Sequence, residues 1–179
     1  MKIAVLGAGA MGGLYSAYLS RHNEVTVIDV NAQVVEKINA DGLEVQEPDG
    51  TSNIYHPHAV LSTEGMEPVD LIVVFVKAMF SESALQNNKS IIGPETYLMT
   101  LQNGSGHEDM LGRFVPQEHI IIGTTQHNAS VAGFGVTKHG GSGMTHMGCV
   151  TGDVNRLQKF ADAFTACGLD ADVSDGVQK

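Results

Sequence analysis

The sequence is poor in positive charge and in cysteine. It holds 10 Lys and Arg against 20 Asp and Glu, which gives a formal net charge of −10. Because phosphate backbones are bound by clustered Lys and Arg, this balance argues against a nucleic-acid partner. The two cysteines, Cys149 and Cys167, form no C-x-x-C pair. We therefore expect neither a zinc site nor a disulfide framework but two buried thiols.

Long apolar runs are also missing. No stretch approaches the roughly 18 uncharged apolar residues of a membrane helix. The start, in which Lys2 is followed at once by an apolar run and glycines, lacks the layout of a signal peptide. We therefore expect no membrane segment and a cytoplasmic location. With 42% hydrophobic residues among 179, the sequence predicts one domain over residues 1–179 with a sizeable core.

What is present is an alternation of short apolar runs and amphipathic stretches. Short apolar runs bounded by polar residues or glycine are typical of buried parallel strands. They are Ile3–Leu6, Val25–Ile28, Leu71–Val76, Tyr97–Leu101 and Ile120–Ile122. Amphipathic stretches between them suit helices that cross over to the next strand. They are Met11–Arg21, Ala32–Ala40 and Ser81–Asn87. The sequence thus predicts a doubly wound α/β fold with a mostly parallel sheet.

Two further regions predict antiparallel strands. Within Leu43–Tyr55, Asp49 and Gly50 stand between two short extended runs, which is a signal for a peripheral hairpin. After Thr125, Gly and Ser interrupt β-like runs, which is consistent with antiparallel strands appended to the parallel sheet. A helix over Val154–Cys167 and a last strand over Leu169–Val173 follow.

Gly7, Gly9 and Gly12 form a G-x-G-x-x-G loop between the first strand and the first helix, the context that a dinucleotide fingerprint needs. In such loops the first glycine permits a tight turn, the second lets a pyrophosphate approach the backbone, and the third lets helix and strand pack closely. The helix N-terminus presents free N–H groups and a positive dipole end to phosphate. We interpret the loop as a dinucleotide site; a purely structural turn is the alternative.

Asp29 closes the second strand. An acidic residue at this place typically accepts hydrogen bonds from the adenosine ribose hydroxyls. Because a carboxylate would repel a 2′-phosphate, Asp29 favours NAD(H) over NADP(H). The alternative is that Asp29 is the N-cap of the helix that starts near Asn31. One carboxylate can also fill both roles.

Polar residues follow the next three predicted strands, at the edge where open α/β sheets bind ligands. Lys77 follows the third strand, Asn103 and Gly104 the fourth, and Thr124 and Thr125 the fifth. Each has an ordinary explanation as a solvated strand end, a turn or a β-edge hydroxyl. Together they indicate one cleft.

The chain has eight histidines, which raises the question of a metal. The spacings of His56, His58, His139 and His146 match no standard zinc pattern, so we expect no metal site. His127 lies beside the expected cleft and could orient a substrate or donate a proton at near-neutral pH. Local hydrogen bonding is the alternative for His127.

Five stretches, in this order, resemble the ketopantoate reductases (2-dehydropantoate 2-reductases): IAVLGAGAMG, VKA, LQNGSGHED, GTTQHNA and GMTHMG. The resemblance covers essentially the whole chain. It implies a Rossmann-type domain and the reduction of the ketone of 2-dehydropantoate to (R)-pantoate with NADPH, in the pathway to pantothenate and coenzyme A. A small keto acid is then the expected partner.

The resemblance also implies roles for individual residues. Lys77 matches the cofactor-side lysine of the family, and an ammonium can meet phosphate or hydroxyl groups of a cofactor. Asn103 matches an asparagine near nicotinamide and substrate, where an amide can orient both without titrating. The matching cofactor loop consists of Gly7, Ala8, Gly9, Ala10, Met11 and Gly12.

The sequence departs from the family pattern at two places. Asp29 stands where the better-known NADPH-using members carry a basic residue. The chain also stops before the helical C-terminal domain of the family, and Lys179 falls short of the proton-donating lysine of that domain. We expect residues 1–179 to be the cofactor-binding part of a reductase, inactive by itself, whose exposed cleft face favours self-association into a homo-oligomer. A non-catalytic nucleotide-binding module and a reductase for another 2-keto acid stay open.

Overall fold

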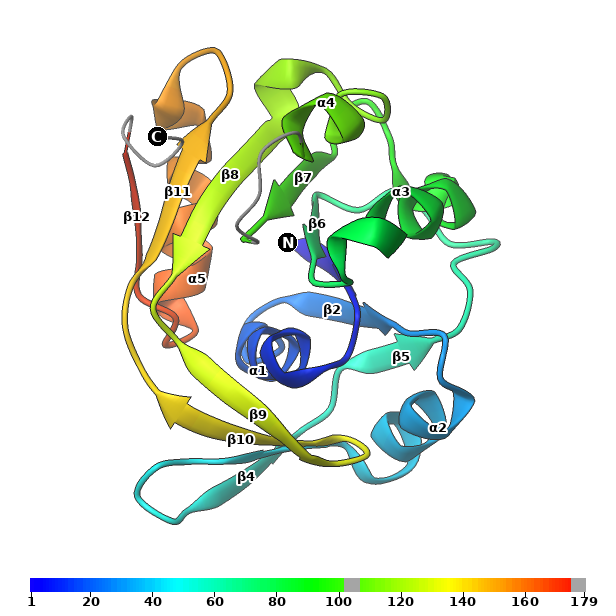
Figure 1. Ribbon diagram of the computed structural model, residues 1–179, viewed down its shortest axis with the longest axis vertical. Coiled ribbons are helices and arrows are strands. Elements are labelled where there is room, and N and C mark those ends of the chain that lie inside the picture. Colours follow the sequence, from blue (N-terminus) through cyan, green and yellow to red (C-terminus); the bar gives the residue numbers. More distant parts are fainter. Residues whose placement is uncertain (102–106, 175–179) are drawn as a thin grey trace.

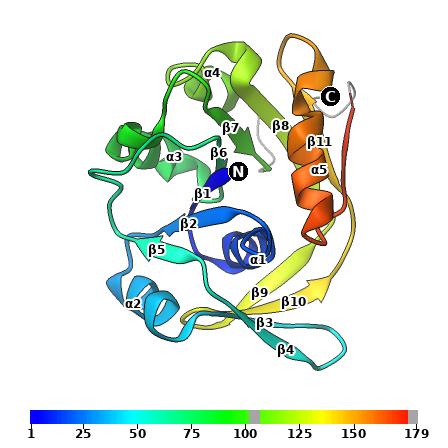
Figure 2. The ribbon, with the colours of Figure 1, turned by 180° about the vertical axis from the view of Figure 1, so that it is seen from behind.

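The computed structural model describes residues 1–101 and 107–174, which form two sheets with helices around and between them (Figures 1 and 2). In this part of the chain the main sheet has eight strands in the order β12-β11-β8-β7-β6-β1-β2-β5. The strands are β1 (Lys2–Leu6), β2 (Glu24–Ile28), β5 (His58–Val60), β6 (Leu71–Val74), β7 (Tyr97–Thr100), β8 (Ile120–Thr125), β11 (Thr145–Cys149) and β12 (Ala171–Val173). The six from β5 to β8 pair in parallel, while β11 runs antiparallel to β8.

Helices cover both faces of the main sheet. They are α1 (Ala10–Leu19), α2 (Ala32–Asp41), α3 (Ala78–Asn87), α4 (His107–Leu111) and α5 (Gln158–Ala166), with short 3-10 turns at Lys89–Ile91, Gln117–His119 and Val154–Leu157. In β1, Ile3 and Val5 pack with α1 and α5, while Ala4 and Leu6 pack with α3 and α4. Because successive strand residues point to opposite faces, burial on both sides explains the continuous apolar runs in the sequence.

The second sheet has the order β4-β3-β10-β9. Its strands are β3 (Leu43–Gln46), β4 (Ser52–Tyr55), β9 (Asn128–Gly133) and β10 (Val136–Gly141). The predicted hairpin is confirmed, since β3 and β4 pair antiparallel. Its place is less peripheral than expected, because β3 also pairs in parallel with β10. Helix α1 contacts β3, β9 and β10 as well as β1 and β2, so it lies between the two sheets.

Several local expectations need correction. The later antiparallel region divides between the sheets, because β9 and β10 join the second sheet and β11 alone extends the main sheet beside β8. The sequence places His56 and His58 in a loop around Pro57, whereas His58 begins strand β5. Helix α3 starts at Ala78, three residues before the predicted start. Cys167 is buried as expected, whereas Cys149 is only half-buried.

The strand order places a reversal between β1 and β6. From β1 the chain adds β2 and β5 on one side, then returns to add β6, β7 and β8 on the other. Ligands of open α/β sheets bind at such a switch point, outside the carboxyl ends of the strands. The ends of β1, β2 and β6 therefore frame the expected ligand site. Among the helices of the described residues, none combines the length and apolarity needed to cross a membrane.

Candidate functional site

The glycine loop starts at the switch point, where β1 ends at Leu6. Gly7 has a φ of +101°, a left-handed conformation that favours glycine. Its N–H donates to the carbonyl oxygen of Ile28 at 2.8 Å, which joins the loop to the end of β2. A Cβ at Gly7 would also lie 3.2 Å from Cγ1 of Val76. The conformation of this position therefore favours glycine, and a side chain here would also press on Val76.

The other two glycines have different structural reasons. A Cβ at Gly12 would lie 1.9 Å from the carbonyl oxygen of Gly7, so α1 approaches the loop too closely for any side chain. A Cβ at Gly9 would meet no described atom within 4 Å. Open space beside the backbone is what an approaching pyrophosphate needs at the second glycine. The loop thus fits a dinucleotide at each of its three glycines.

The N-terminus of α1 opens at this loop. Gly9 is its N-cap, in an extended conformation and without a side-chain cap, and the first turn of α1 contains no acidic residue. The first backbone bond across this end joins the Gly13 N–H to the Gly9 oxygen at 2.7 Å. The preceding N–H groups of a helix have no intrahelical acceptor, and the helix dipole adds positive potential. This end of α1 therefore suits an anion such as phosphate.

Asp29 lies at the end of β2, next to the loop. Its Oδ2 accepts a hydrogen bond from the Ala8 N–H at 2.8 Å, and its Oδ1 accepts one from the Asn31 N–H at 2.9 Å. Helix α2 is capped by Asn31 itself, whose Oδ1 accepts from the Gln33 N–H at 2.9 Å. The alternative reading of Asp29 as the N-cap is therefore wrong, because Asn31 fills that position. The ribose role of Asp29 stays a prediction.

A cavity of about 500 Å³ opens beside the loop and brings several predicted site residues together. Gly7, Gly9, Asp29 and Lys77 all line it. Lys77 is exposed and occupies the N-cap position of α3, so its ammonium can approach a ligand in the cavity without burial of its charge. Backbone N–H groups, a carboxylate and an ammonium therefore share one space.

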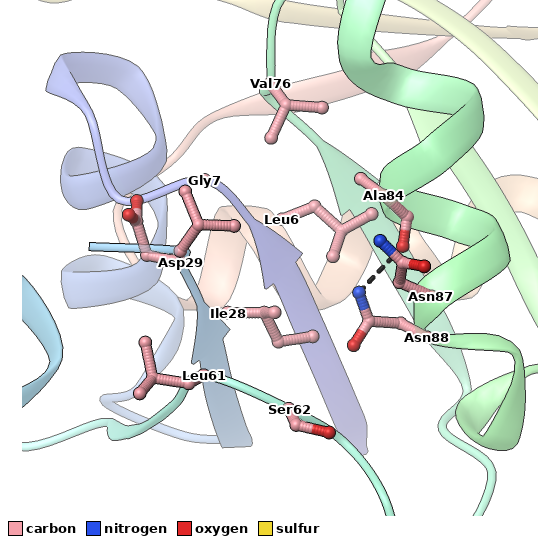
Figure 3. Close-up of a pocket in the computed structure, with 11 residues that line it drawn as sticks. Leu6, Gly7, Ile28, Asp29, Leu61, Ser62, Val76, Ala84, Asn87 and Asn88 are labelled. Atoms are coloured by element: carbon pink, nitrogen blue, oxygen red, sulfur yellow. Dashed lines mark hydrogen bonds between the residues drawn. The ribbon is translucent and has the colours of Figure 1, made fainter. Parts of the chain in front are cut away.

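Much of the remaining wall of this cavity is apolar, with Ser83 and Asn87 as its other polar side chains. Val30, Phe75 and Phe80 line it, which gives a flat ring-bearing ligand a surface to contact. A neighbouring cavity of about 220 Å³ shares Asp29 and Val30 with the first and adds Leu61. Figure 3 shows this smaller cavity between the ends of β1 and β2 and helix α3. Binding pockets for small molecules combine mostly apolar walls with a few fixed polar groups, and this pair of cavities fits that description.

The other residues predicted for the cleft are not found among the described residues at these two cavities. Asn103 and Gly104 lie outside the described residues, as does Lys179. Thr125 faces α1, because its Oγ1 accepts a hydrogen bond from the Tyr15 hydroxyl at 2.7 Å. Neither Thr124 nor Thr125 is among the described residues that line the two cavities.

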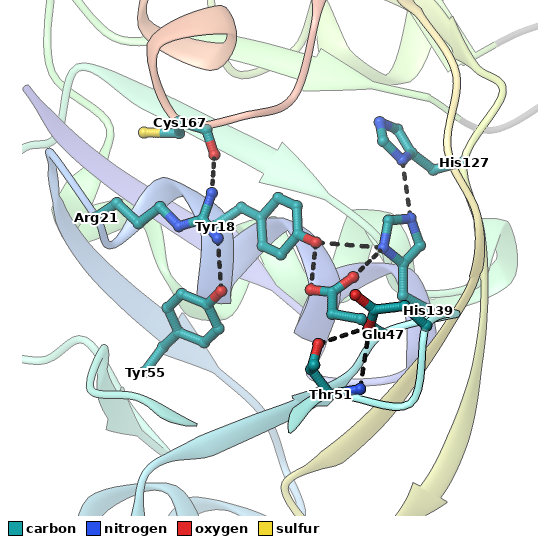
Figure 4. A network of polar contacts seen from close by, with 9 residues as sticks. Tyr18, Arg21, Glu47, Thr51, Tyr55, His127, His139 and Cys167 are labelled. Atoms are coloured by element: carbon teal, nitrogen blue, oxygen red, sulfur yellow. Dashed lines mark hydrogen bonds and ion pairs between the residues drawn. The ribbon is translucent and has the colours of Figure 1, made fainter. Parts of the chain in front are cut away.

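His127 belongs to a buried network of polar side chains (Figure 4). Its Nδ1 lies 3.3 Å from Nε2 of His139, whose Nδ1 lies 2.9 Å from Oε1 of Glu47. The Tyr18 hydroxyl donates to the other oxygen of Glu47 at 2.5 Å. Since a carboxylate oxygen accepts, Nδ1 of His139 is the donor toward Glu47, and the remaining nitrogen of His139 shares a hydrogen bond with Nδ1 of His127. The structure thus shows local hydrogen bonding at His127, and a role toward a substrate stays a prediction.

The outer nitrogen of His127 is unsatisfied. His127 is 7% exposed, and its Nε2 has no hydrogen-bond partner in the described part of the chain. Burial lowers the pKa of His127, and the neighbouring His139 lowers it further, against a smaller opposing effect of Asp170. The network joins residues of α1, the β3–β4 turn and β10. No local sequence signal indicates it, because its members are distant in the chain.

Over residues 1–101 and 107–174, no group of three or more His, Cys, Asp or Glu is placed to hold a metal ion. His146 pairs instead with Asp172, with 2.6 Å between Nδ1 and Oδ1, and this contact joins β11 to β12.

The sheet order, the glycine loop at the switch point and the cavity beside it define a Rossmann-type α/β domain. The family model described as ketopantoate reductase PanE/ApbA matches residues 3–152. The chain belongs to this family, as the resemblance in the sequence predicted.

Individual relatives agree with this assignment. The chain is 34% identical to the 2-dehydropantoate 2-reductase of Lactococcus lactis, over 99% of this chain and 58% of that protein. It is 30% identical to the 2-dehydropantoate 2-reductase of Halobacterium salinarum, over 100% of this chain and 59% of that protein. The chain therefore spans less than two thirds of the length of these relatives.

Solved structures give the same picture of the fold. The ternary structure of D-mandelate dehydrogenase with NADH and anilino(oxo)acetate matches with a TM-score of 0.92 and 38% identity, over 99% of this chain and 58% of that one. The 2-dehydropantoate 2-reductase of Geobacter metallireducens matches with a TM-score of 0.87 and 28% identity, over 98% and 58%.

Proposed function

We propose that this chain is the cofactor-binding part of a reductase that converts 2-dehydropantoate to (R)-pantoate with a reduced nicotinamide dinucleotide. The observation that carries the proposal is the glycine loop at the switch point, with open space at Gly9 beside the N-terminus of α1. Membership of the ketopantoate reductase family supports the substrate. When bound, the nicotinamide would supply a hydride for a keto carbon.

The residues of the site divide the binding of such a cofactor among them. The N–H groups at the start of α1, together with the loop from Gly7 to Gly12, would hold the pyrophosphate. Asp29 would accept from the adenosine ribose hydroxyls, and Lys77, which lines the same cavity, would meet a phosphate or hydroxyl group. Asn103 would orient nicotinamide and substrate, as the family resemblance implies.

NADH is the preferred form of the cofactor in this proposal. Lys77 is the only cation among the described residues that line the two cavities, and the carboxylate of Asp29 stands where a 2′-phosphate would need positive charge. The related D-mandelate dehydrogenase was solved with NADH, which supports this preference.

A reductase for another 2-keto acid is the second candidate function. The neighbour with 38% identity is a D-mandelate dehydrogenase in complex with anilino(oxo)acetate, and that identity exceeds the 34% shared with the 2-dehydropantoate 2-reductase of Lactococcus lactis. This observation favours an NADH-dependent reduction of a bulkier 2-keto acid. A non-catalytic nucleotide-binding module is a third reading, and cofactor binding without turnover in any longer form of the protein would support it.

Parallel titrations of the chain with NADH and NADPH, followed by nicotinamide fluorescence, test the proposal. We expect both to bind, with NADH the tighter, and Asp29→Ala to bring the two dissociation constants closer together. Binding of neither cofactor would contradict the proposal. Tighter binding of NADPH would contradict the part assigned to Asp29.

A further inference from the structure

The carboxylate of Asp29 is held by backbone N–H groups from two different elements. Ala8, in the glycine loop, donates to Oδ2 at 2.8 Å, and Asn31, at the start of α2, donates to Oδ1 at 2.9 Å. Each carboxylate oxygen therefore already has one donor from the protein. Hydrogen bonds to an ionised acceptor are stronger than neutral ones, so these two contacts fix the side chain before any ligand binds.

The backbone of Asp29 is fixed as well. Its N–H donates to the carbonyl oxygen of Val60 in β5 at 3.2 Å, and the preceding residue, Ile28, accepts from the Gly7 N–H at 2.8 Å. The end of β2 thus holds the glycine loop twice, through the carbonyl of Ile28 and through the side chain of Asp29. These two contacts define the path of the chain from Gly7 to Gly9, the segment that presents the open phosphate space.

We propose that Asp29 is a positioning residue for the phosphate half of the cofactor site, acting through the Ala8 N–H in addition to any contact with the adenosine ribose. This inference rests on the proposed function, since it concerns the same cofactor. The carboxylate of Asp29 would then affect binding of the cofactor phosphates without touching them.

The arrangement also gives a second reason for selectivity against a 2′-phosphate. A phosphate next to Asp29 repels the carboxylate, and the carboxylate can retreat only by releasing the N–H of Ala8 or of Asn31. Binding of NADP(H) would then loosen the loop that holds its own pyrophosphate. Adding a positive charge elsewhere in the cavity would not restore this contact.

The first test uses reduced nicotinamide mononucleotide, which has no adenosine and so cannot contact Asp29 through the adenosine ribose. Asp29→Asn keeps the shape of the side chain but removes its charge and leaves a single acceptor oxygen for the two N–H groups of Ala8 and Asn31, so that the contact with Ala8 is lost or becomes a weaker neutral hydrogen bond. We expect this variant to raise the dissociation constant of the mononucleotide about tenfold or more, as the loss of a charge-assisted hydrogen bond implies.

The matched control is Asn31→Ala. It removes the side-chain cap of α2 in the same connection but leaves the contact between Ala8 and Asp29 in place. Its dissociation constant for the mononucleotide should stay within about twofold of the wild type, because a cap contributes to helix stability and not to the loop. If Asp29→Asn weakens NADH but leaves the mononucleotide within the same limit, Asp29 acts on the ribose alone and the inference is overturned.

A second measurement needs no ligand and does not depend on how well the variant folds. In the cofactor-free wild type, amide hydrogen exchange at Ala8 should be slowed at least about tenfold relative to an unprotected amide, because that N–H is bonded to Asp29. The Gly13 amide, bonded to the Gly9 oxygen, serves as the internal reference. Unprotected exchange at Ala8 overturns the inference. Failure of the wild type to bind NADH would overturn the proposed function instead, while exchange at Ala8 would still decide whether Asp29 holds the loop.

Discussion

Gly9 and Gly12 lie in the same loop, yet an added methyl group would meet open space at one and a carbonyl oxygen at the other. We expect Gly12→Ala to lower the free energy of unfolding by about 2 kcal/mol, because overpacking outweighs the gain in helix propensity. Gly9→Ala should cost less than about 1 kcal/mol, the price of a poorer N-cap. Urea unfolding measures both.

Gly9→Ala, which should cost less stability than Gly12→Ala, should nevertheless weaken the binding of NADH. Since the methyl group of Gly9→Ala would occupy the space assigned to pyrophosphate, we expect its dissociation constant for NADH to rise about tenfold or more. If Gly9→Ala binds NADH as the wild type does, the phosphate does not lie at this glycine.

Protonation of His127 should reduce stability at acid pH. Burial and His139 lower the pKa of His127 in the folded state, so the unfolded chain takes up the proton more readily, at a pKa of about 6.5. The contribution of neutral His127 is therefore fully present above that pH and is lost as the pH falls toward the lowered folded pKa. Denaturant midpoints between pH 7.5 and 5 measure this loss.

His127→Gln removes the titrating group and should flatten that part of the pH profile. The same substitution at His22, which is exposed, is the control and should leave the profile as in the wild type. An unchanged slope in His127→Gln would show that other groups cause the acid sensitivity.

Some features at the scale of single residues can be predicted from the sequence, and others cannot. The reasons for Gly7, Gly9 and Gly12 were predictable, because the loop is local and its spacing carries its chemistry. The contact between Asp29 and Ala8 and the network at His127 were not, because their partners come from other segments. Only the packing of β1 against β2, and of α1 against β10, brings these groups together.

At the scale of elements, one hydroxyl of α1 makes hydrogen bonds to two strands of the main sheet. Tyr15 bonds through its hydroxyl to both Thr125 of β8 and Thr145 of β11, each at 2.7 Å. Tyr15→Phe should lower the free energy of unfolding by about 1–2 kcal/mol, because it leaves the fully buried hydroxyl of Thr145 without this partner. Thermal or urea unfolding measures the change.

Tyr55→Phe is the matched control. The Tyr55 hydroxyl accepts from Arg21 in an exposed contact, so its loss should cost less than about 0.5 kcal/mol. Equal effects of the two substitutions would mean that the hydroxyl of Tyr15 does not join the helix to these strands.

The elements themselves were largely predictable where burial is complete. β1, β2, β6 and β7 form continuous apolar runs because helices cover both of their faces. Strand β5, with its pattern of one buried and two more exposed residues, was missed for lack of such a run. The pairing of β3 with β10 was missed because nothing in either strand specifies so distant a partner.

At the scale of the whole molecule, exposed apolar side chains gather around the cavities. Val30, which is 96% exposed, lines both cavities, and the exposed Leu61 and Phe80 line one each; Met79, which is 79% exposed, precedes Phe80 in α3. Exposed apolar patches tend to find a partner, so we expect light scattering to show self-association of this chain at high concentration. Met79→Ser should weaken it.

Phe134→Ser tests whether the association depends on this surface. Phe134 is 52% exposed but follows β9 in the second sheet, so this substitution should leave self-association unchanged. A strictly monomeric wild type across the concentration range would contradict the expectation.

The second sheet also constrains the order in which a nascent chain can fold on the ribosome. β3 and β4 emerge together and can form their hairpin at once, but the other edge of β3 pairs with Val136–Lys138 of β10, which are synthesised much later. Until then, the side of α1 that packs on β9 and β10 has nothing to cover it. Such transiently exposed apolar surface is where chaperones bind and aggregation begins. Since β11 and β12 of the main sheet are also synthesised after Val136, a ribosome that stalls there would hold α1 with both of its sheets still incomplete.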